Sequence, residues 1–321
     1  MKKRIVIAGG TGFLGRALQS YFTEIGFEVY LLTRNPLGPN EVYWDGESFG
    51  EWCYLLEGTY ALINLAGKSV NCRYTEKNKA LIRSSRLNST HILGKALQVF
   101  SPAPKYWINS STATIYEHTE GDAPHNTEHL GRIADDFSVL VAKDWEAAFE
   151  SYQLPETKKL ILRTAIVFGN EGGAYPVMRD LAKKGLCSPQ GNGRQWISWI
   201  HVDDFCRAID HLMEEEKEGI FNLCAPNYLR NRDFFHLLRE KLKPPFIIPQ
   251  PKWLLEFGAI FMGTETELIL KSRKVYPEKL LRMDYRFLYE DMESCLEDLL
   301  KKKESQQKAK SISYTVENGA V

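Results

Sequence analysis

The chain has 321 residues, 44% of them hydrophobic and 26% charged, and its 41 basic side chains balance its 41 acidic ones. A neutral chain lacks the basic surface that nucleic-acid binding needs, and no apolar run approaches the roughly 18 residues that cross a bilayer, so we expect neither a nucleic-acid nor a membrane partner. The six cysteines form no Cys-x-x-Cys pair, which is typical of reduced thiols and predicts a cytoplasmic location.

Short β-branched runs alternate with helical patterns through the first 170 residues. The patterns predict helices over 15–26, 75–100 and 133–152, and strands over 4–9, 28–33, 60–67, 105–111 and 159–169. Strands that alternate with helices favour a parallel sheet covered on both faces. The predicted fold class is therefore α/β, with a Rossmann-type doubly wound sheet.

The pattern changes after Gly169, where glycine and proline become denser. Short strands are expected over 197–202 and 219–225, with helices over 204–216 and 231–242. Asp203 or Asp204 would be the N-cap of the first of these helices, and His201 is interpreted as structural. We predict a cofactor-binding domain over 1–170, a small mixed capping region over 171–301, and a disordered polar tail over 302–321.

A glycine-rich turn joins the first predicted strand to the first helix. Gly9, Gly12 and Gly15 follow the spacing G-x-x-G-x-x-G. Glycine is needed where the backbone approaches a pyrophosphate closely, and the free N–H groups of the following helix bind the phosphates. The strand–turn–helix context indicates a dinucleotide site rather than a glycine-rich turn without a ligand.

The end of the second strand bears on the choice of cofactor. An NAD site of this kind ends that strand with an acidic residue for the ribose diol, whereas this chain has Thr33 followed by Arg34. An arginine pairs with the 2′-phosphate of NADP. NADP is favoured over NAD, and the alternative is that Arg34 is a solvated loop residue.

Several motifs resemble the extended branch of the short-chain dehydrogenase/reductase superfamily, in which NAD(P)-dependent epimerases and dehydratases fall. They are TGFLG at 11–15, NLAG at 64–67, SSTATIY at 110–116 and IHVDD at 200–204. Further segments resemble one subfamily, the epimerase family proteins, which have a C-terminal domain of unassigned role: 73–86, 144–148, 198–204 and 275–281. The resemblance implies a Rossmann fold, bound NADP and a substrate that is generally undefined.

The resemblance also implies which residues contact the cofactor. They lie in the glycine loop, at strand ends and on the helix over 75–100: Gly9, Thr11, Gly12, Phe13, Leu14, Gly15, Thr33, Arg34, Leu65, Ala66, Gly67, Arg86, Ser110, Ser111, Ile166 and Val167. Arg86 stands near the nicotinamide half and suits a phosphate or an anionic substrate. The alternative for Arg86 is an exposed helix residue.

Two loops face the substrate in the fold that the resemblance implies. One contains Asn71 and Arg73, and the other, rich in glycine, contains Arg194 and Gln195 beside Trp196. An arginine next to an aromatic ring suits a phosphate and a ring. The expected substrate is small and polar, with nucleotide-linked or phosphorylated compounds as examples.

The chemistry of the superfamily needs a serine or threonine hydroxyl, a tyrosine, and a lysine one helical turn later that lowers the pKa of the tyrosine. Thr112 supplies the hydroxyl. The register places Phe137 and Val141 where the tyrosine and the lysine would stand. Substitute acids are Tyr116, for which core packing is the alternative, and Asp144, for which an interhelix hydrogen bond is the alternative.

Residues 125–129 read H-N-T-E-H and match H-x-x-E-H, a zinc-protease signature. That site needs both histidines on one helical face, but Pro124 and Gly131 bracket a stretch too short for a stable helix. We predict a loop and no metal.

Two functions remain open. The first is an NADP-dependent oxidoreductase or epimerase with a non-standard active site. The second is an NADP-binding sensor or assembly protein without turnover. A homodimer through the helices over 75–100 and 133–152 is expected from the resemblance.

Overall fold

The computed structural model describes residues 2–248 and 271–302. Its centre is a seven-stranded sheet of order β10-β6-β5-β4-β1-β2-β3, with every neighbouring pair parallel. The strands are β1 (Arg4–Ala8), β2 (Glu28–Thr33), β3 (Glu41–Tyr43), β4 (Ala61–Asn64), β5 (Tyr106–Thr112), β6 (Lys158–Thr164) and β10 (Gly219–Leu223). The predicted doubly wound Rossmann-type sheet is confirmed.

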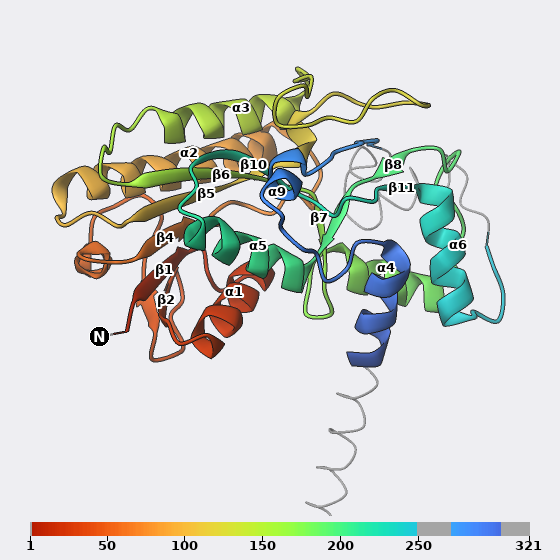
Figure 1. The fold of residues 1–321 in the computed structure, drawn as a ribbon, viewed down its shortest axis with the longest axis horizontal. Coiled ribbons are helices and arrows are strands. Elements are labelled where there is room, and N and C mark those ends of the chain that lie inside the picture. Colours follow the sequence, from red (N-terminus) through yellow and green to blue (C-terminus); the bar gives the residue numbers. More distant parts are fainter. Residues whose placement is uncertain (1, 249–270, 303–321) are drawn as a thin grey trace, which may run out of the picture.

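Helices cover both faces of the sheet (Figure 1). Helices α1 (Phe13–Glu24) and α5 (Val202–Glu214) pack on the face that buries Ile5 and Ile7. Helices α2 (Glu76–Val99) and α3 (Phe137–Glu150) pack on the opposite face. Successive strand side chains point to opposite faces, so the continuous apolar run of β1 supplies both cores. None of the described helices is long and apolar enough to cross a membrane.

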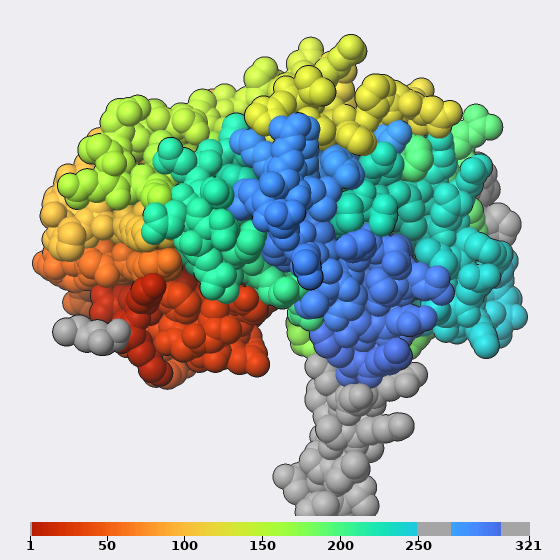
Figure 2. Space-filling model, in the orientation of Figure 1, coloured from red at the N-terminus to blue at the C-terminus, as the bar shows by residue number. Residues whose placement is uncertain are grey.

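A smaller mixed layer follows the sixth strand. Strand β7 (Ile166–Phe168) pairs with β9 (Trp199–His201), and β8 (Trp196–Ile197) pairs with β11 (Leu229–Arg230). Helices α4 (Ala174–Lys183) and α6 (Asn231–Leu242) share a core with residues 292–302, which are helical as far as they are described. Residues 271–302, blue in Figure 2, lie between this layer and the sheet.

The boundary predicted at residue 170 stays a prediction, because the sheet itself takes β10 from beyond that position. The short helix α9 (Glu278–Arg282) packs beside β10. Of the tail predicted over 302–321, Lys302 is still helical, and 303–321 lie outside the described residues.

Several predicted elements have different bounds in the structure. The helix expected over 133–152 begins at Phe137, because the side chain of Asp136 accepts from the N–H of Val139 and caps it. The strand expected over 159–169 is two strands in two sheets, broken at Ala165. Elements that the sequence did not reveal include β3, β11, α4 and the 3-10 helices η1 (Glu51–Leu56) and η2 (Ala113–Ile115).

A buried ion pair joins the sheet to α3. The Arg163 guanidinium of β6 donates to both carboxylate oxygens of Glu146, at 3.0 and 2.7 Å. The same carboxylate accepts from the hydroxyl of Ser111, at 2.6 Å. With side-chain exposures of 9% and 11%, the pair is removed from water, so each charge needs the other.

We expect Glu146→Ala to lower the free energy of unfolding by about 3–5 kcal/mol, because Arg163 would stay buried without its carboxylate. The control is Asp144→Ala on the same helix. It breaks the more exposed pair with Arg83 and should cost at most about 1 kcal/mol. Urea denaturation measures both, and equal losses in the two variants would contradict the argument.

Candidate cofactor and substrate site

The glycine loop lies at the carboxyl ends of the strands, where the strand order reverses between β1 and β4. This is the place where doubly wound sheets bind ligands. Gly9 has a φ of +70°, and a Cβ on it would stand 2.8 Å from the Cα of Ala66. A Cβ on Gly15 would overlap the carbonyl oxygen of Gly10. The loop conformation therefore requires glycine at both positions.

The start of α1 offers an open cradle. Its N-cap, Gly12, makes no side-chain cap, and the first turn has no acidic residue, so the first N–H groups have no partner in the helix. A Cβ on Gly12 would approach nothing closer than 4.0 Å, which leaves room for a pyrophosphate. The Phe13 side chain packs against Gly169 and Gly172.

Two residues at the end of β2 fit a 2′-phosphate. Thr33 is nearly buried, and its hydroxyl lies 3.3 Å from that of Thr11. Arg34 is exposed and has no ion pair or side-chain hydrogen bond among the described residues. A free guanidinium beside the phosphate loop is suited to an additional phosphate.

The end of β4 is fixed by a buried amide. Asn64 donates to Asn109 at 2.8 Å and to Thr90 at 3.1 Å, and it accepts from the N–H of Ala66 at 3.1 Å. These bonds set the path of residues 65–67 beside the glycine loop. Sequence reasoning missed Asn64 and Asn109; the signal was an asparagine at the end of each apolar run, ALIN and YWIN.

Arg86 on α2 lies against that segment and is half-buried rather than exposed. Its Nη1 donates to the carbonyl oxygens of Lys68 at 3.1 Å and Ile82 at 2.9 Å. The guanidinium stands 5.1 Å from the centre of the Trp145 ring. Burial lowers the pKa of Arg86 to about 10, and the nearby Tyr74 opposes that effect.

The hydroxyl predicted to orient the substrate is at the end of β5. Thr112 Oγ1 accepts from the N–H of Thr114 at 3.1 Å and donates to its hydroxyl at 3.0 Å, which caps η2. Phe137 begins α3, and its ring lies edge-on to that of Tyr74, with centroids 5.3 Å apart. Val141 is buried. Sequence reasoning did not single out Tyr74, because only the fold brings it beside position 137.

The two substitute acids have structural partners. Tyr116 has no exposed surface, donates to Asn222 at 2.8 Å and accepts from Arg163 at 3.1 Å; burial raises the pKa of its phenol. Asp144 accepts from Arg83 of α2 at 2.6 Å. The packing interpretation of Tyr116 and the interhelix hydrogen bond of Asp144 are both confirmed.

The remaining residues predicted to contact the cofactor differ in exposure. The hydroxyl of Ser111 is committed to Glu146, so it faces the interior. Ser110 is half-buried, and its carbonyl oxygen accepts from the side chain of Asn109. Ile166 is exposed and Val167 is buried.

The residues of the two predicted substrate loops also differ in exposure. Asn71, Arg73 and Arg194 are exposed. Gln195 is buried, and its amide donates to the carbonyl oxygen of Gln190 at 3.0 Å, so it holds its own loop together. The glycine-rich loop instead presents Trp196, whose ring lies 4.1 Å from the guanidinium of Arg230.

Comparison with known proteins agrees with this geometry. Residues 5–224 match the NAD dependent epimerase/dehydratase family. The chain belongs to that family. Residues 250–299 match a domain of unknown function, DUF1731.

The similar proteins cover nearly the whole chain. Human epimerase family protein SDR39U1 is 31% identical over 92% of this chain and 99% of its own length. Epimerase family protein YfhF of Bacillus subtilis is 32% identical over 92% of this chain and 97% of its own. A crystal structure of the human protein with NADPH superposes with a TM-score of 0.83 at 28% identity, covering 93% of this chain and 99% of that one.

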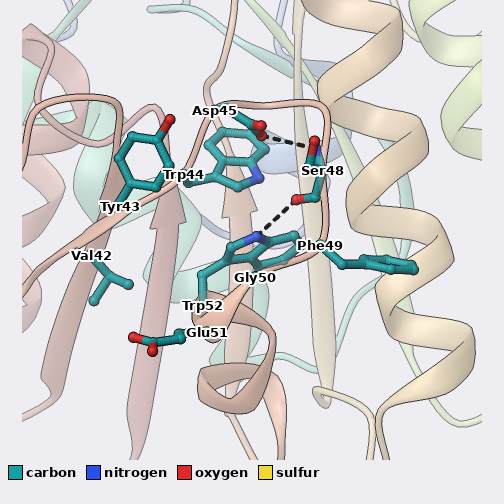
Figure 3. Close-up of a pocket in the computed structure, with 9 residues that line it drawn as sticks. All are labelled: Val42, Tyr43, Trp44, Asp45, Ser48, Phe49, Gly50, Glu51 and Trp52. Carbon is teal, nitrogen blue, oxygen red and sulfur yellow. Dashed lines mark hydrogen bonds between the residues drawn. The ribbon is translucent and has the colours of Figure 1, made fainter.

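This epimerase/dehydratase family member also has two surface pockets away from the glycine loop. One, of about 180 Å³, lies beyond the edge strand β3 and is lined by residues 42–45 and 48–52, among them Trp44 and Trp52 (Figure 3). The other, of about 500 Å³, is lined by Glu47 and by residues of α2. Neither includes a residue predicted to bind the cofactor or the substrate.

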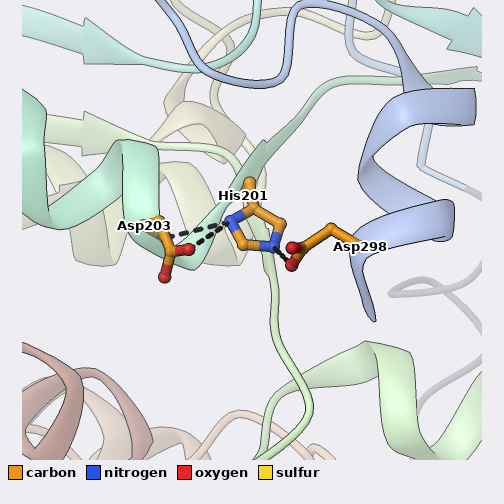
Figure 4. Close-up of side chains that lie close together, drawn as sticks. All are labelled: His201, Asp203 and Asp298. Atoms are coloured by element: carbon orange, nitrogen blue, oxygen red, sulfur yellow. Dashed lines mark hydrogen bonds and ion pairs between the residues drawn. The ribbon is translucent and has the colours of Figure 1, made fainter. Parts of the chain in front are cut away.

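One group in the described part of the chain has metal-ligand types close together: His201, Asp203 and Asp298 (Figure 4). His201 is the N-cap of α5, because its Nδ1 accepts from the N–H of Asp203 at 3.1 Å. The prediction that Asp203 or Asp204 caps this helix is therefore wrong. Lys302 lies 2.8 Å from Asp203 and 3.0 Å from Asp298, so a lysine already supplies the cation, and the structural interpretation of His201 is confirmed.

The H-x-x-E-H stretch contains no turn of helix. Its His125 stacks on Tyr276, with ring centroids 4.4 Å apart. Its Glu128 accepts from the N–H of Asn222 at 2.9 Å. The predicted loop is confirmed; His125 holds it to the C-terminal region, and Glu128 holds it to β10 of the sheet.

Buried His201 should make stability depend on pH. Burial lowers its pKa, so below the ordinary histidine pKa of about 6.5 protons bind the unfolded chain first, and stability falls with falling pH. The substitution His201→Asn keeps the cap acceptor. When the pH falls from about 7 to about 5, we expect the free energy of unfolding of this variant to decrease by about 1 kcal/mol less than that of the wild type. Urea denaturation at both pH values measures this, and parallel losses would contradict it.

Proposed function

We propose that this protein is an NADP-dependent oxidoreductase or epimerase with a small polar substrate. The open start of α1 carries the proposal, since Gly12 leaves space for a pyrophosphate and no side chain of residues 2–248 or 271–302 caps the free N–H groups. The free cation of Arg34 beside Thr33 favours NADP over NAD. The NADPH in the similar human protein supports the same choice.

The residues around the cradle have separable roles in this proposal. The glycine loop holds the pyrophosphate, Arg34 holds the 2′-phosphate, and residues 65–67 form a wall beside the cofactor. When bound, the nicotinamide supplies or accepts a hydride. The Thr114 hydroxyl can rotate to donate to Thr112, which then directs its own proton to a substrate oxygen.

Position 137 has no proton to transfer, because it is phenylalanine. The donor must come from another element, and Tyr74 brings a phenol to that end of α3 by packing on Phe137. This arrangement keeps acid–base chemistry possible without the usual tyrosine and lysine.

The second candidate is an NADP-binding sensor or assembly protein without turnover. Phe137 and Val141 favour it, since Phe137 cannot donate a proton and Val141 has no charge that could lower the pKa of a donor. A cytoplasmic location and a homodimer through α2 and α3 remain predictions for either function.

We expect Arg34→Ala to reduce the preference for NADPH over NADH by about tenfold to a hundredfold, because the 2′-phosphate loses its charge-assisted hydrogen bonds. Affinity for NADH should stay the same. Fluorescence titration with both cofactors measures the ratio, and Lys95→Ala, at an exposed position on α2, is the control. An unchanged ratio would refute the role of Arg34.

Turnover separates the two functions. We expect the wild type to oxidise NADPH with at least one compound of a library of polar aldehydes and ketones. Thr112→Val should slow that reaction by about a hundredfold, as loss of one positioned hydrogen bond does, and leave the Kd of NADPH unchanged. Thr112→Ser, which keeps the hydroxyl, should restore the rate. Tight NADPH binding without oxidation by any compound would favour the sensor.

A further inference from the structure

Residues 271–276 form an extended segment that binds the loop following η2. The N–H of Thr119 donates to the carbonyl oxygen of Ser272 at 3.0 Å. Asn126 exchanges two backbone hydrogen bonds with the segment, at 2.6 and 2.9 Å. Because this loop continues directly from η2, the segment holds the chain that leads away from Thr112.

The same segment also binds residues 196–198, which follow the glycine-rich substrate loop. The N–H of Arg273 donates to the carbonyl oxygen of Trp196 at 3.1 Å. The Ser198 hydroxyl donates to the carbonyl oxygen of Arg273 and accepts from the N–H of Val275, both at 2.9 Å. Backbone groups removed from water need such partners, so the C-terminal region joins two loops that are far apart in the sequence.

The side chain of Arg273 reaches two elements of the candidate site. It is 7% exposed, and its Nη2 donates to the carbonyl oxygen of Thr114 at 3.4 Å. The same nitrogen lies 3.6 Å from Oδ2 of Asp136. Thr114 shares two hydrogen bonds with Thr112, and Asp136 caps α3. One rigid guanidinium therefore connects the strand end that bears the hydroxyl to the start of the helix opposite it.

Charge makes this connection stronger. Lys271 donates to Oδ1 of Asp136 at 3.1 Å. Burial would raise the pKa of Asp136, but the hydrogen bond and charge of Lys271 and then the charge of Arg273 hold it below its ordinary value. An ionised carboxylate is the stronger acceptor for the N–H of Val139, so both cations support the cap of α3.

The bonds of the 271–276 segment lie on the substrate side of the site. In the part of the chain that the structure describes, they run to the two loops, to β10, to η2 and to the cap of α3, and none runs to the glycine loop. The cofactor cradle is fixed by other groups, among them Asn64. The segment is therefore placed to act on the substrate half of the cleft.

We propose that Arg273 is a positioning residue of the active site. By binding the Thr114 carbonyl oxygen and the carboxylate of Asp136 at once, it sets the orientation of Thr112 relative to the start of α3. Arg273 lies in the part of the chain that matches DUF1731, so the proposal gives this C-terminal domain a role in turnover rather than in holding the cofactor. The inference deepens the proposed function and rests on it for the reaction.

The kinetic test uses the full chain with saturating NADPH and a carbonyl compound of the library that the wild type reduces. Arg273→Met keeps the length of the side chain and removes its donors and its charge. We expect kcat to fall by about tenfold to a hundredfold, as a small misplacement of a reacting group does. The Kd of NADPH and the KM of the compound should change less than about threefold.

Two further variants separate positioning from a general effect on the fold. Arg273→Lys keeps a cation for Asp136 and should recover at least about threefold of the lost rate. Arg282→Met, in the same region, removes an exposed arginine that pairs with Glu278 and should react as the wild type does. An unchanged kcat in Arg273→Met, or an equal loss in Arg282→Met, would overturn the proposal.

Amide hydrogen exchange of the full chain gives a readout that needs no substrate. In Arg273→Met we expect faster exchange in peptides covering 110–116 and 134–142, because the bonds around Thr114 and the cap of α3 open more often. Exchange in the peptide covering 5–15 should stay the same. Unchanged exchange in the first two peptides would overturn the proposal.

Asp136→Asn provides an independent check, because asparagine keeps the helix cap and lacks the charge that attracts Arg273. This variant decides the matter if Arg273→Met does not fold. It should show the same loss of kcat and the same faster exchange, and wild-type values would overturn the proposal.

Failure of the proposed function has a different signature. If no compound oxidises NADPH while exchange around Thr112 still depends on Arg273, the arrangement stands and the enzyme proposal falls. If NADPH is oxidised but Arg273→Met reacts and exchanges as the wild type does, the reverse holds.

Discussion

The hydrogen bond between the buried amides of Asn64 and Asn109 fixes the path of the chain beside the glycine loop. It joins the last residue of β4 to the middle of β5, near the edge where a doubly wound sheet opens to ligands. A buried amide without partners would cost free energy, so this pair fixes the end of β4 relative to β5. Through Ala66 the same amide sets the wall of the cofactor cradle, and through Thr90 it binds α2, the helix of Arg86.

Two arginines show two ways in which this fold holds a guanidinium away from water. Arg163 has its carboxylate inside the protein, and that pair ties β6 to α3. Arg86 lies at the edge of the cleft with carbonyl oxygens as partners and no carboxylate. Carbonyl dipoles orient a guanidinium without neutralising it. The first arginine therefore ties the sheet to α3 through its carboxylate, whereas the second is held by backbone carbonyl oxygens alone.

Local patterns predicted the parts of the fold that depend on local physics. The glycine loop, the ends of β2 and the bounds of α6 could be found because backbone approach, strand alternation and helical period act over a few residues. The break at Ala165 and the cap by His201 depend on pairing with β9 and on packing with Asp298, far along the chain. The contact of Tyr74 with Phe137 is of the same kind, so no motif could reveal it.

The charged residues at the start of α3 come from other parts of the chain. Asp136, which caps the helix, is bound by Lys271 at 3.1 Å and lies 3.6 Å from Arg273. Both cations come from the C-terminal region, so that region holds the residue that caps α3. In the standard arrangement the proton donor and its cation come from this helix alone. Here the cations around position 137 come from Lys79 of α2 and from the C-terminal region, so the charge at this position depends on how those segments pack.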